Sequence, residues 1–194
     1  SGPVGNLTLA ELKKLDAGSW KGSQFKNIPI PTLDEALAIM PENIWLNVHL
    51  KGGVELAKKT TERLAAHQRL HQAFLACGAP AAAAARLVNP KIQICNMERQ
   101  ANSLQYVKET IGYKSEFIQL YGGNQVDPAH TKILRGERIR INFCCANEAD
   151  KVHQLFQAGV EFPLVDKLAS MLTVAYQHKI PRLQPIYRSR LKHG

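Results

Sequence analysis

The chain has 194 residues, of which 45% are hydrophobic, and its formal net charge is +9 at neutral pH. This hydrophobic content is enough to bury a core, and it argues against an intrinsically disordered chain. No run approaches the roughly 18 uninterrupted apolar residues of a membrane-spanning helix. The composition therefore predicts a folded globular protein without a transmembrane segment.

Two helix starts are visible near the beginning of the chain. The sequence Thr8-Leu9-Ala10-Glu11 has the pattern of a capping box, and Gly18 follows as a stop signal. Thr32-Leu33-Asp34-Glu35 repeats the same pattern at the start of an apolar stripe. We expect a short helix after each threonine.

From residue 46 onward, strand and helix signals alternate along the chain. We expect strands at 46–50, 73–77, 92–97, 117–121, 139–145 and 162–165. The helices expected between them cover 54–67, 80–88 and 102–111, then one capped by Asp127 with Pro128 at its first position, and one from Asn147 to Gly159. This alternation predicts a parallel sheet covered by helices. Periodicity alone allows an open doubly wound sheet as well as a barrel.

Polar residues alternate with apolar ones in the strand Leu-Asn-Val-His-Leu-Lys at 46–51. Strand geometry places Asn47, His49 and Lys51 on one face. A buried polar stripe needs partners or a ligand, because an unsatisfied polar group costs roughly 1–3 kcal/mol. The stripe is therefore a candidate active-site feature; the alternative is a core histidine bonded to a neighbouring strand.

The four cysteines, Cys77, Cys95, Cys144 and Cys145, have no metal-binding spacing. Adjacent Cys144 and Cys145 should point to opposite faces of a strand, so we do not expect them to share a zinc site. Cys77, Cys95 and Cys144 lie in or beside predicted strands, where we expect small, buried, apolar cysteines.

Three stretches of this sequence resemble the glycerophosphodiester phosphodiesterases, which are TIM-barrel enzymes. The run Leu-Thr-Leu-x-Glu-Leu at 7–12 is specific to the family and leads into a short insertion, here ending near residue 31. The strand at 46–51 stands where the family has Glu-x-Lys, and residues 139–166 stand where it has a strand, Trp-Thr-Val-Asn, a helix and Thr-Asp.

The resemblance implies a fold and a domain organisation. It selects an α/β chain forming an incomplete TIM (β/α)8 barrel, with about six of eight βα units and the first two strands missing. We expect residues 1–173 to form this truncated barrel domain, with the insertion inside 1–31, and residues 174–194 to form a basic tail. The chain should correspond to the last two-thirds of such an enzyme, which leaves its compartment, cytoplasmic or exported, open.

The resemblance also implies a reaction, the metal-dependent hydrolysis of glycerophosphodiesters to glycerol 3-phosphate and an alcohol. Both catalytic histidines and two metal carboxylates of the family precede the region matched here, so we expect no catalytic residue in this chain and no activity from it alone. His49 stands at the third metal ligand. The family metal is Mg²⁺ or Ca²⁺, and the histidine shifts the preference toward Zn²⁺ or Mn²⁺.

The remaining candidate positions are at strand ends. Lys51 occupies the position of the family's phosphate-site lysine, and Cys144 that of the tryptophan that lines the family's active site. Glu98 could replace a lost carboxylate. Asn96 and Gln119 are further substrate-binding candidates. The alternative role is a surface salt bridge for Glu98 and packing for Gln119. Asp166 should cap the turn that follows it.

Two other functions stay open at this point. The chain could be a non-catalytic relative that binds a phosphate ligand through Lys51, His49 and Glu98. It could also be a basic interaction module that uses the tail residues Lys179, Arg182, Arg188, Arg190 and Lys192. Aromatic residues are sparse in the tail, so we expect no nucleic-acid partner. The open sheet edges predict self-association.

Overall fold

The structure is a computed structural model that describes residues 2–123 and 125–188. It divides into two compact units, Ser1–Met40 and Pro41–Gly194. Within the described part of the chain, no helix has the length and apolar character needed to cross a membrane.

The first unit contains two short α-helices, α1 (Leu9–Leu12) and α2 (Leu33–Ile39), and the 3-10 helices Val4–Asn6 and Ser23–Phe25. Both predicted capping boxes form: the Thr8 hydroxyl accepts from the Glu11 amide, and the Thr32 hydroxyl accepts from the Glu35 amide. In return, the carboxylate of each glutamate accepts a hydrogen bond from the backbone amide of its threonine. The two bonds satisfy amide donors at the start of the helix that would otherwise lack partners.

The carboxylate of Asp16 organises the loop between these helices. It accepts hydrogen bonds from the amides of Gly18, Ser19 and Asn27, at 2.8, 3.0 and 2.9 Å. Asp16 also forms an antiparallel bridge with Pro29, so the two ends of the loop lie side by side. At Gly18, any Cβ would overlap the carbonyl oxygen of Phe25. Close backbone packing therefore requires glycine at position 18, whereas the helix that Gly18 was predicted to end already ends at Leu12.

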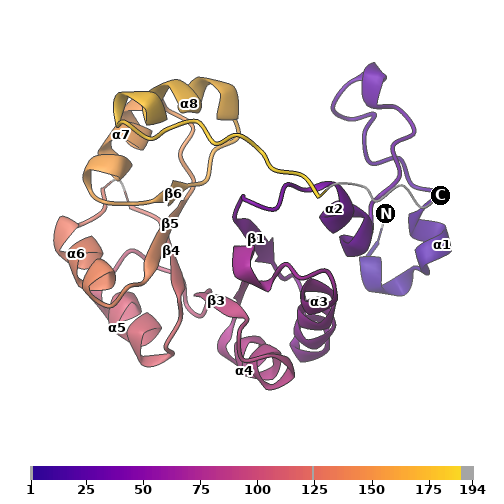
Figure 1. Cartoon of the computed structure of the whole chain (residues 1–194), viewed down its shortest axis with the longest axis horizontal. Coiled ribbons are helices and arrows are strands. Elements are labelled where there is room, and N and C mark those ends of the chain that lie inside the picture. Colours follow the sequence, from indigo (N-terminus) through magenta and orange to yellow (C-terminus); the bar gives the residue numbers. More distant parts are fainter. Residues whose placement is uncertain (1, 124, 189–194) are drawn as a thin grey trace. The chain divides into compact units, whose positions relative to one another are not determined.

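The second unit is built around a six-stranded parallel sheet in the order β1-β2-β3-β4-β5-β6 (Figure 1). Its strands are β1 (Leu46–His49), β2 (Ala73–Cys77), β3 (Gln93–Asn96), β4 (Phe117–Tyr121), β5 (Arg140–Cys144) and β6 (Phe162–Pro163). The helices are α3 (Val54–Ala66), α4 (Ala79–Val88), α5 (Leu104–Gly112), α6 (Pro128–Gly136), α7 (Ala149–Gln157) and α8 (Leu168–Gln177), with a 3-10 turn at Leu70–Gln72. This is the sheet of a partial TIM barrel, as the sequence predicted.

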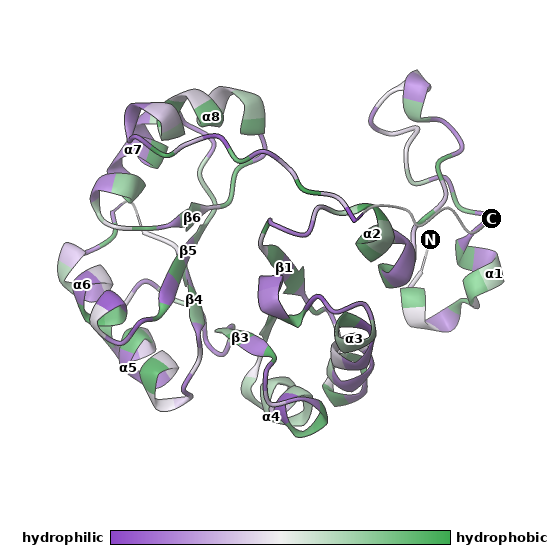
Figure 2. Cartoon of the chain, in the orientation of Figure 1, coloured by the Kyte–Doolittle hydropathy of each residue, from purple (hydrophilic) through white to green (hydrophobic). Residues whose placement is uncertain are grey.

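The largest apolar cluster lies between the outer face of the sheet and the helices. Ile118 and Leu120 of β4 and Ile141 and Phe143 of β5 are buried there with residues of α5, α6, α7 and α8. Hydrophobic and hydrophilic segments alternate along α5, α6 and α7 in Figure 2, as expected of helices with one buried face. This packing leaves the alternate residues of each strand on the concave face.

Two sequence predictions need correction near the end of the chain. Asn147 does not cap α7, whose N-cap is Glu148, and Asp166 does not cap a turn. Instead, the Asn147 side-chain amide donates to the Asp166 carboxylate, and the Asn147 side-chain oxygen accepts from the Asp166 backbone amide. Both hydrogen bonds are 2.8 Å long. Helix α8, which contains residues 173 and 174, was not predicted from the sequence.

The segment after α8 returns to the beginning of the second unit. The side chain of Asn43 donates to the carbonyl oxygen of Gln184 at 2.7 Å and accepts from the amide of Ile186 at 2.8 Å. Arg188 donates to the carboxylate of Glu42 at 2.8 Å. We call residues 180–188 the strap. These contacts hold the strap, which is part of the basic tail, against Glu42 and Asn43. The tail residues Arg190 and Lys192 lie outside the described residues.

Candidate active site

The concave face of the sheet holds a pocket of about 380 Å³. Its lining comes from β1, β2, β5, β6 and their flanks: Trp45, Asn47, His49, Phe74, Asn142, Phe162, Pro163 and Leu164. Residues of β1 and β6 lie at opposite ends of the strand order, so they can line one pocket only because the sheet curves. Strand alternation thus directs Asn47 and His49 to the concave side, while Leu46 is buried.

Aromatic side chains form one wall of this pocket. Phe74 stacks on Phe117 with ring centroids 4.0 Å apart, and Trp45 meets Phe117 edge-on at 5.2 Å. Phe162 lies 6.1 Å from Phe117. The guanidinium of Arg140 lies 4.9 Å from the Trp45 ring centroid, in cation-π geometry. The wall is apolar, so the polar groups of a ligand would have to be bound by Asn47 and His49 of β1.

His49 lies at the carboxyl end of β1, where catalytic groups of barrel enzymes are found. Desolvation, and then the positive charge of Lys51, lower the pKa of His49 below its ordinary value of 6.5. The imidazole is therefore held in its neutral form near physiological pH, able to accept a proton or a hydrogen bond. Lys51 follows the strand and is exposed, next to the histidine but not in the pocket wall.

The two candidates at the end of β3 have structural partners. Asn96 is buried and faces α5: its amide donates to the Thr110 hydroxyl at 2.9 Å, and its oxygen accepts from the Glu98 amide. Asn96 therefore points to the helix layer, away from the concave pocket. The Glu98 carboxylate accepts from the Ala79 amide at 3.0 Å and so caps the start of α4.

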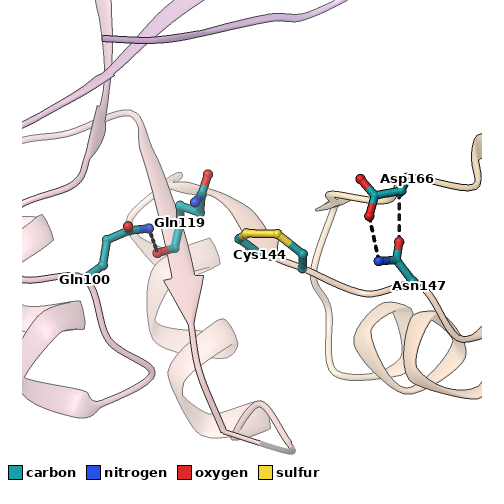
Figure 3. The surroundings of a disulfide bond; sticks show 6 residues. Gln100, Gln119, Cys144, Asn147 and Asp166 are labelled. Carbon is teal, nitrogen blue, oxygen red and sulfur yellow. Dashed lines mark hydrogen bonds between the residues drawn. A yellow bond between two sulfur atoms is a disulfide. The ribbon is translucent and has the colours of Figure 1, made fainter. Parts of the chain in front are cut away.

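Gln119, in the middle of β4, and Cys144, at the carboxyl end of β5, lie on neighbouring strands of the sheet (Figure 3). Gln119 is buried, and its side-chain oxygen has no hydrogen-bond partner among the described residues; the same holds for Asn142, its register partner on β5. The carbonyl oxygen of Gln119 accepts from Gln100 at 3.1 Å. These amides belong to the interior of the half-barrel.

The prediction that Cys144 and Cys145 point to opposite faces was wrong, because a disulfide joins them (Figure 3). Strand β5 ends at Cys144, so the strand alternation on which the prediction relied does not extend to Cys145. Cys144 is half-buried and Cys145 is exposed. A disulfide thus occupies the position at which the family has the tryptophan that lines its active site.

The residues present do not make the metal centre that the family implies. No group of three or more His, Cys, Asp and Glu side chains within residues 2–123 and 125–188 could hold a metal ion. His49 would be one ligand among several, and Glu98 is engaged at α4. We therefore derive no chemical step through a metal from these residues.

Several lining residues were not predicted. Trp45, Phe74, Asn142 and Phe162 belong to the pocket, yet no motif marks them. The signal that identifies them is strand register: Asn47 pairs with Phe74, and Asn142 pairs with Phe162, so each pair shares a face. Register was not available from a single sequence.

Comparison with known proteins identifies relatives of this chain. Residues 1–170 match the glycerophosphoryl diester phosphodiesterase family. The Bacillus subtilis (strain 168) protein YhdW, named provisionally as a glycerophosphodiester phosphodiesterase, is 50% identical over 52 residues. That stretch is 27% of this chain and 21% of YhdW, so the alignment spans about a fifth of the relative's length.

Solved structures share the fold. An Oleispira antarctica phosphodiesterase in complex with the product sn-glycerol-3-phosphate superposes with a TM-score of 0.73 at 20% identity, covering 90% of this chain and 73% of that one. A glycerophosphodiester phosphodiesterase from Agrobacterium tumefaciens str. C58 gives 0.69 at 16% identity, with coverages of 90% and 74%. With the family match over most of its length, this chain belongs to the glycerophosphoryl diester phosphodiesterase family.

Proposed function

We propose that this chain carries part of a glycerophosphodiester phosphodiesterase site, which hydrolyses a glycerophosphodiester to glycerol 3-phosphate and an alcohol. In that reaction, water adds to phosphorus and the bond to the departing alcohol oxygen breaks. The observation that carries the proposal is the polar stripe of β1, with Asn47 and His49 lining the concave pocket. The family match and the product complex of the Oleispira antarctica relative support the same substrate class.

Charge and hydrogen bonding assign a role to each residue of the stripe. Lys51 offers a positive charge to the phosphate, and Asn47 offers an amide to a phosphoryl or hydroxyl oxygen. His49, held neutral, can accept a proton from water or bind a metal ion through its lone pair. A divalent metal would require ligands beyond those in the described residues, so metal dependence stays a prediction.

We further propose that the 194-residue chain has no measurable turnover by itself. The His-Arg-Gly strand, the paired carboxylates and the His-Asp dipeptide of the family have no counterpart in its sequence. An assay with glycerophosphocholine, supplemented in turn with Mg²⁺, Ca²⁺, Mn²⁺ and Zn²⁺, tests this point. Turnover that disappears in a His49→Ala variant would contradict it.

Ligand binding tests the site independently of turnover. Titration of glycerol 3-phosphate, followed by NMR shifts of residues lining the pocket, should show binding that weakens by about threefold to tenfold in Lys51→Met. The matched control is Lys91→Met, at the amino end of the sheet. Equal affinity of the wild type and Lys51→Met would remove Lys51 from the site.

A second candidate function is phosphate-ligand binding without catalysis. It is favoured by the lack of a metal-ligand cluster in the described part of the chain. Binding of glycerol 3-phosphate without turnover, in a chain extended at its amino end with the family's catalytic segment, would support this candidate over the enzyme.

A further inference from the structure

The four cysteines of the chain fall into two chemically different pairs. Cys77 and Cys95 are free thiols that are only 5% and 0% exposed. Burial raises the pKa of the Cys77 thiol to about 11 and moves that of Cys95 in the same direction. Since the thiolate is the reactive form, we expect these two residues to be protected from thiol reagents in the folded protein. Cys144 and Cys145 differ because they are disulfide-bonded, with Cys144 half-buried and Cys145 exposed to solvent.

The accessible pair lies at the mouth of the half-barrel. Cys144 is the last residue of β5 and lies in register with Tyr121, the exposed last residue of β4. The residues that follow the pair, Ala146 and Asn147, are hydrogen-bonded to the segment that follows β6. The Ala146 amide donates to the Leu164 carbonyl oxygen at 2.9 Å, and two hydrogen bonds join Asn147 to Asp166. Opening of the disulfide would therefore change residues 144 and 145 and leave the fold on either side anchored.

We propose that Cys144 and Cys145 form a thiol–disulfide exchange site at the carboxyl edge of the sheet, with small dithiols as the reductant and small disulfides as the oxidant. In reduction, a thiolate of the dithiol attacks one of the two sulfurs and the Cys144–Cys145 bond breaks. The resulting mixed disulfide is resolved by the second thiol of the reductant, which becomes a cyclic disulfide. Two electrons and two protons pass to the protein, and a small disulfide reverses the step.

Differential alkylation of the full chain tests the proposal. Native protein purified without reductant is treated with N-ethylmaleimide, then denatured and treated with iodoacetamide. Its peptides are then analysed by mass spectrometry. The expected result is that neither reagent labels residues 144 and 145, and that iodoacetamide labels Cys77 and Cys95. After mild treatment with dithiothreitol under native conditions, N-ethylmaleimide should label Cys144 and Cys145 while Cys77 and Cys95 stay protected.

A second measurement asks whether the two thiols act as a unit. Phenylarsine oxide condenses with two adjacent thiols, forming two As–S bonds and releasing one water. The reduced protein should take up one equivalent, Cys145→Ser should take up none, and the matched control Cys77→Ala should bind like the wild type. The proposal is overturned if N-ethylmaleimide labels Cys144 and Cys145 without reduction, if native dithiothreitol leaves them unlabelled, or if Cys145→Ser still binds the arsenical.

Discussion

At the scale of single residues, the electrostatic coupling between His49 and Lys51 is directly measurable. Desolvation and the Lys51 charge both disfavour the imidazolium, so the pKa of His49 lies below 6.5 in the folded protein. We expect Lys51→Met to raise the pKa of His49, but not beyond the ordinary value, because desolvation persists. NMR titration of the imidazole protons, with Lys91→Met as the control, measures the shift. An unchanged midpoint would contradict the coupling.

The same shift sets the sign of a small pH effect on stability. The unfolded chain binds the His49 proton more tightly than the folded chain does, so stability rises with pH in this window. The contribution is complete above pH 6.5 and is lost as the pH falls from there toward the lower folded pKa. The side chain is exposed, so the effect is small. Comparison of urea midpoints between the wild type and His49→Gln across this pH range should show it.

Asp16 is the second residue whose effect reaches beyond its own side chain. Hydrogen bonds from Ser19, Asn27 and Gly18 lower the pKa of its carboxyl group well below the usual range. The ionised form therefore holds the loop closed at neutral pH, and this contribution is lost only in strong acid, as the pH falls through the folded pKa. We expect Asp16→Ala to open the loop and speed trypsin cleavage after Lys21 and Lys26 several-fold.

The control for this experiment is Asp150→Ala, an exposed acidic residue in the first turn of α7. It should leave the rate of cleavage after Lys21 and Lys26 unchanged. Equal cleavage rates in Asp16→Ala and the wild type would show that the loop does not depend on the carboxylate.

At the scale of elements, the strap after α8 should depend on Asn43. This side chain makes two hydrogen bonds to the strap main chain, to Gln184 and Ile186. A net hydrogen bond contributes about 0.5–1.5 kcal/mol, and less where water competes, so Asn43→Ala should cost about 1 kcal/mol. Hydrogen exchange at residues 183–188 should become faster, and urea unfolding gives the free energy.

Gln105→Ala provides the comparison, because the exposed Gln105 side chain bonds within its own helix, to Glu109, and has no other hydrogen bond to the described residues. It should leave exchange in the strap unchanged. If Asn43→Ala also leaves that exchange unchanged, the strap is held by other contacts, such as the ion pair of Arg188 with Glu42.

At the scale of the whole molecule, the two end strands of the described sheet decide how the chain behaves in solution. Strand β1 pairs only with β2, and β6 pairs only with β5, so each has one side without a strand partner among the described residues. Such edges invite strand addition from another chain. We expect the 194-residue chain to self-associate at micromolar concentration. Size-exclusion chromatography with light scattering measures this, and a stable monodisperse monomer would refute it.

Much of the local structure follows from the sequence because its causes are local. Both capping boxes, the Asp127–Pro128 helix start and the strands at 73–77 and 117–121 form as predicted. Each depends on side chains within a few residues of the element. Helix α8 was missed although Leu168, Met171, Leu172 and Ala175 have helical spacing, because the resemblance to the family weakens there.

The sequence by itself determined the alternation of strands and helices, the family and the polar face of β1. The tertiary structure alone decided which polar residues meet. Asn96 follows the alternation onto the outer face and bonds to α5, while Asn142, which no motif marks, lines the pocket through its register with β6. Likewise, the Cys144–Cys145 disulfide depends on where β5 ends. Register, curvature and strand ends are set by contacts between residues far apart in the chain, and for that reason no local pattern reveals them.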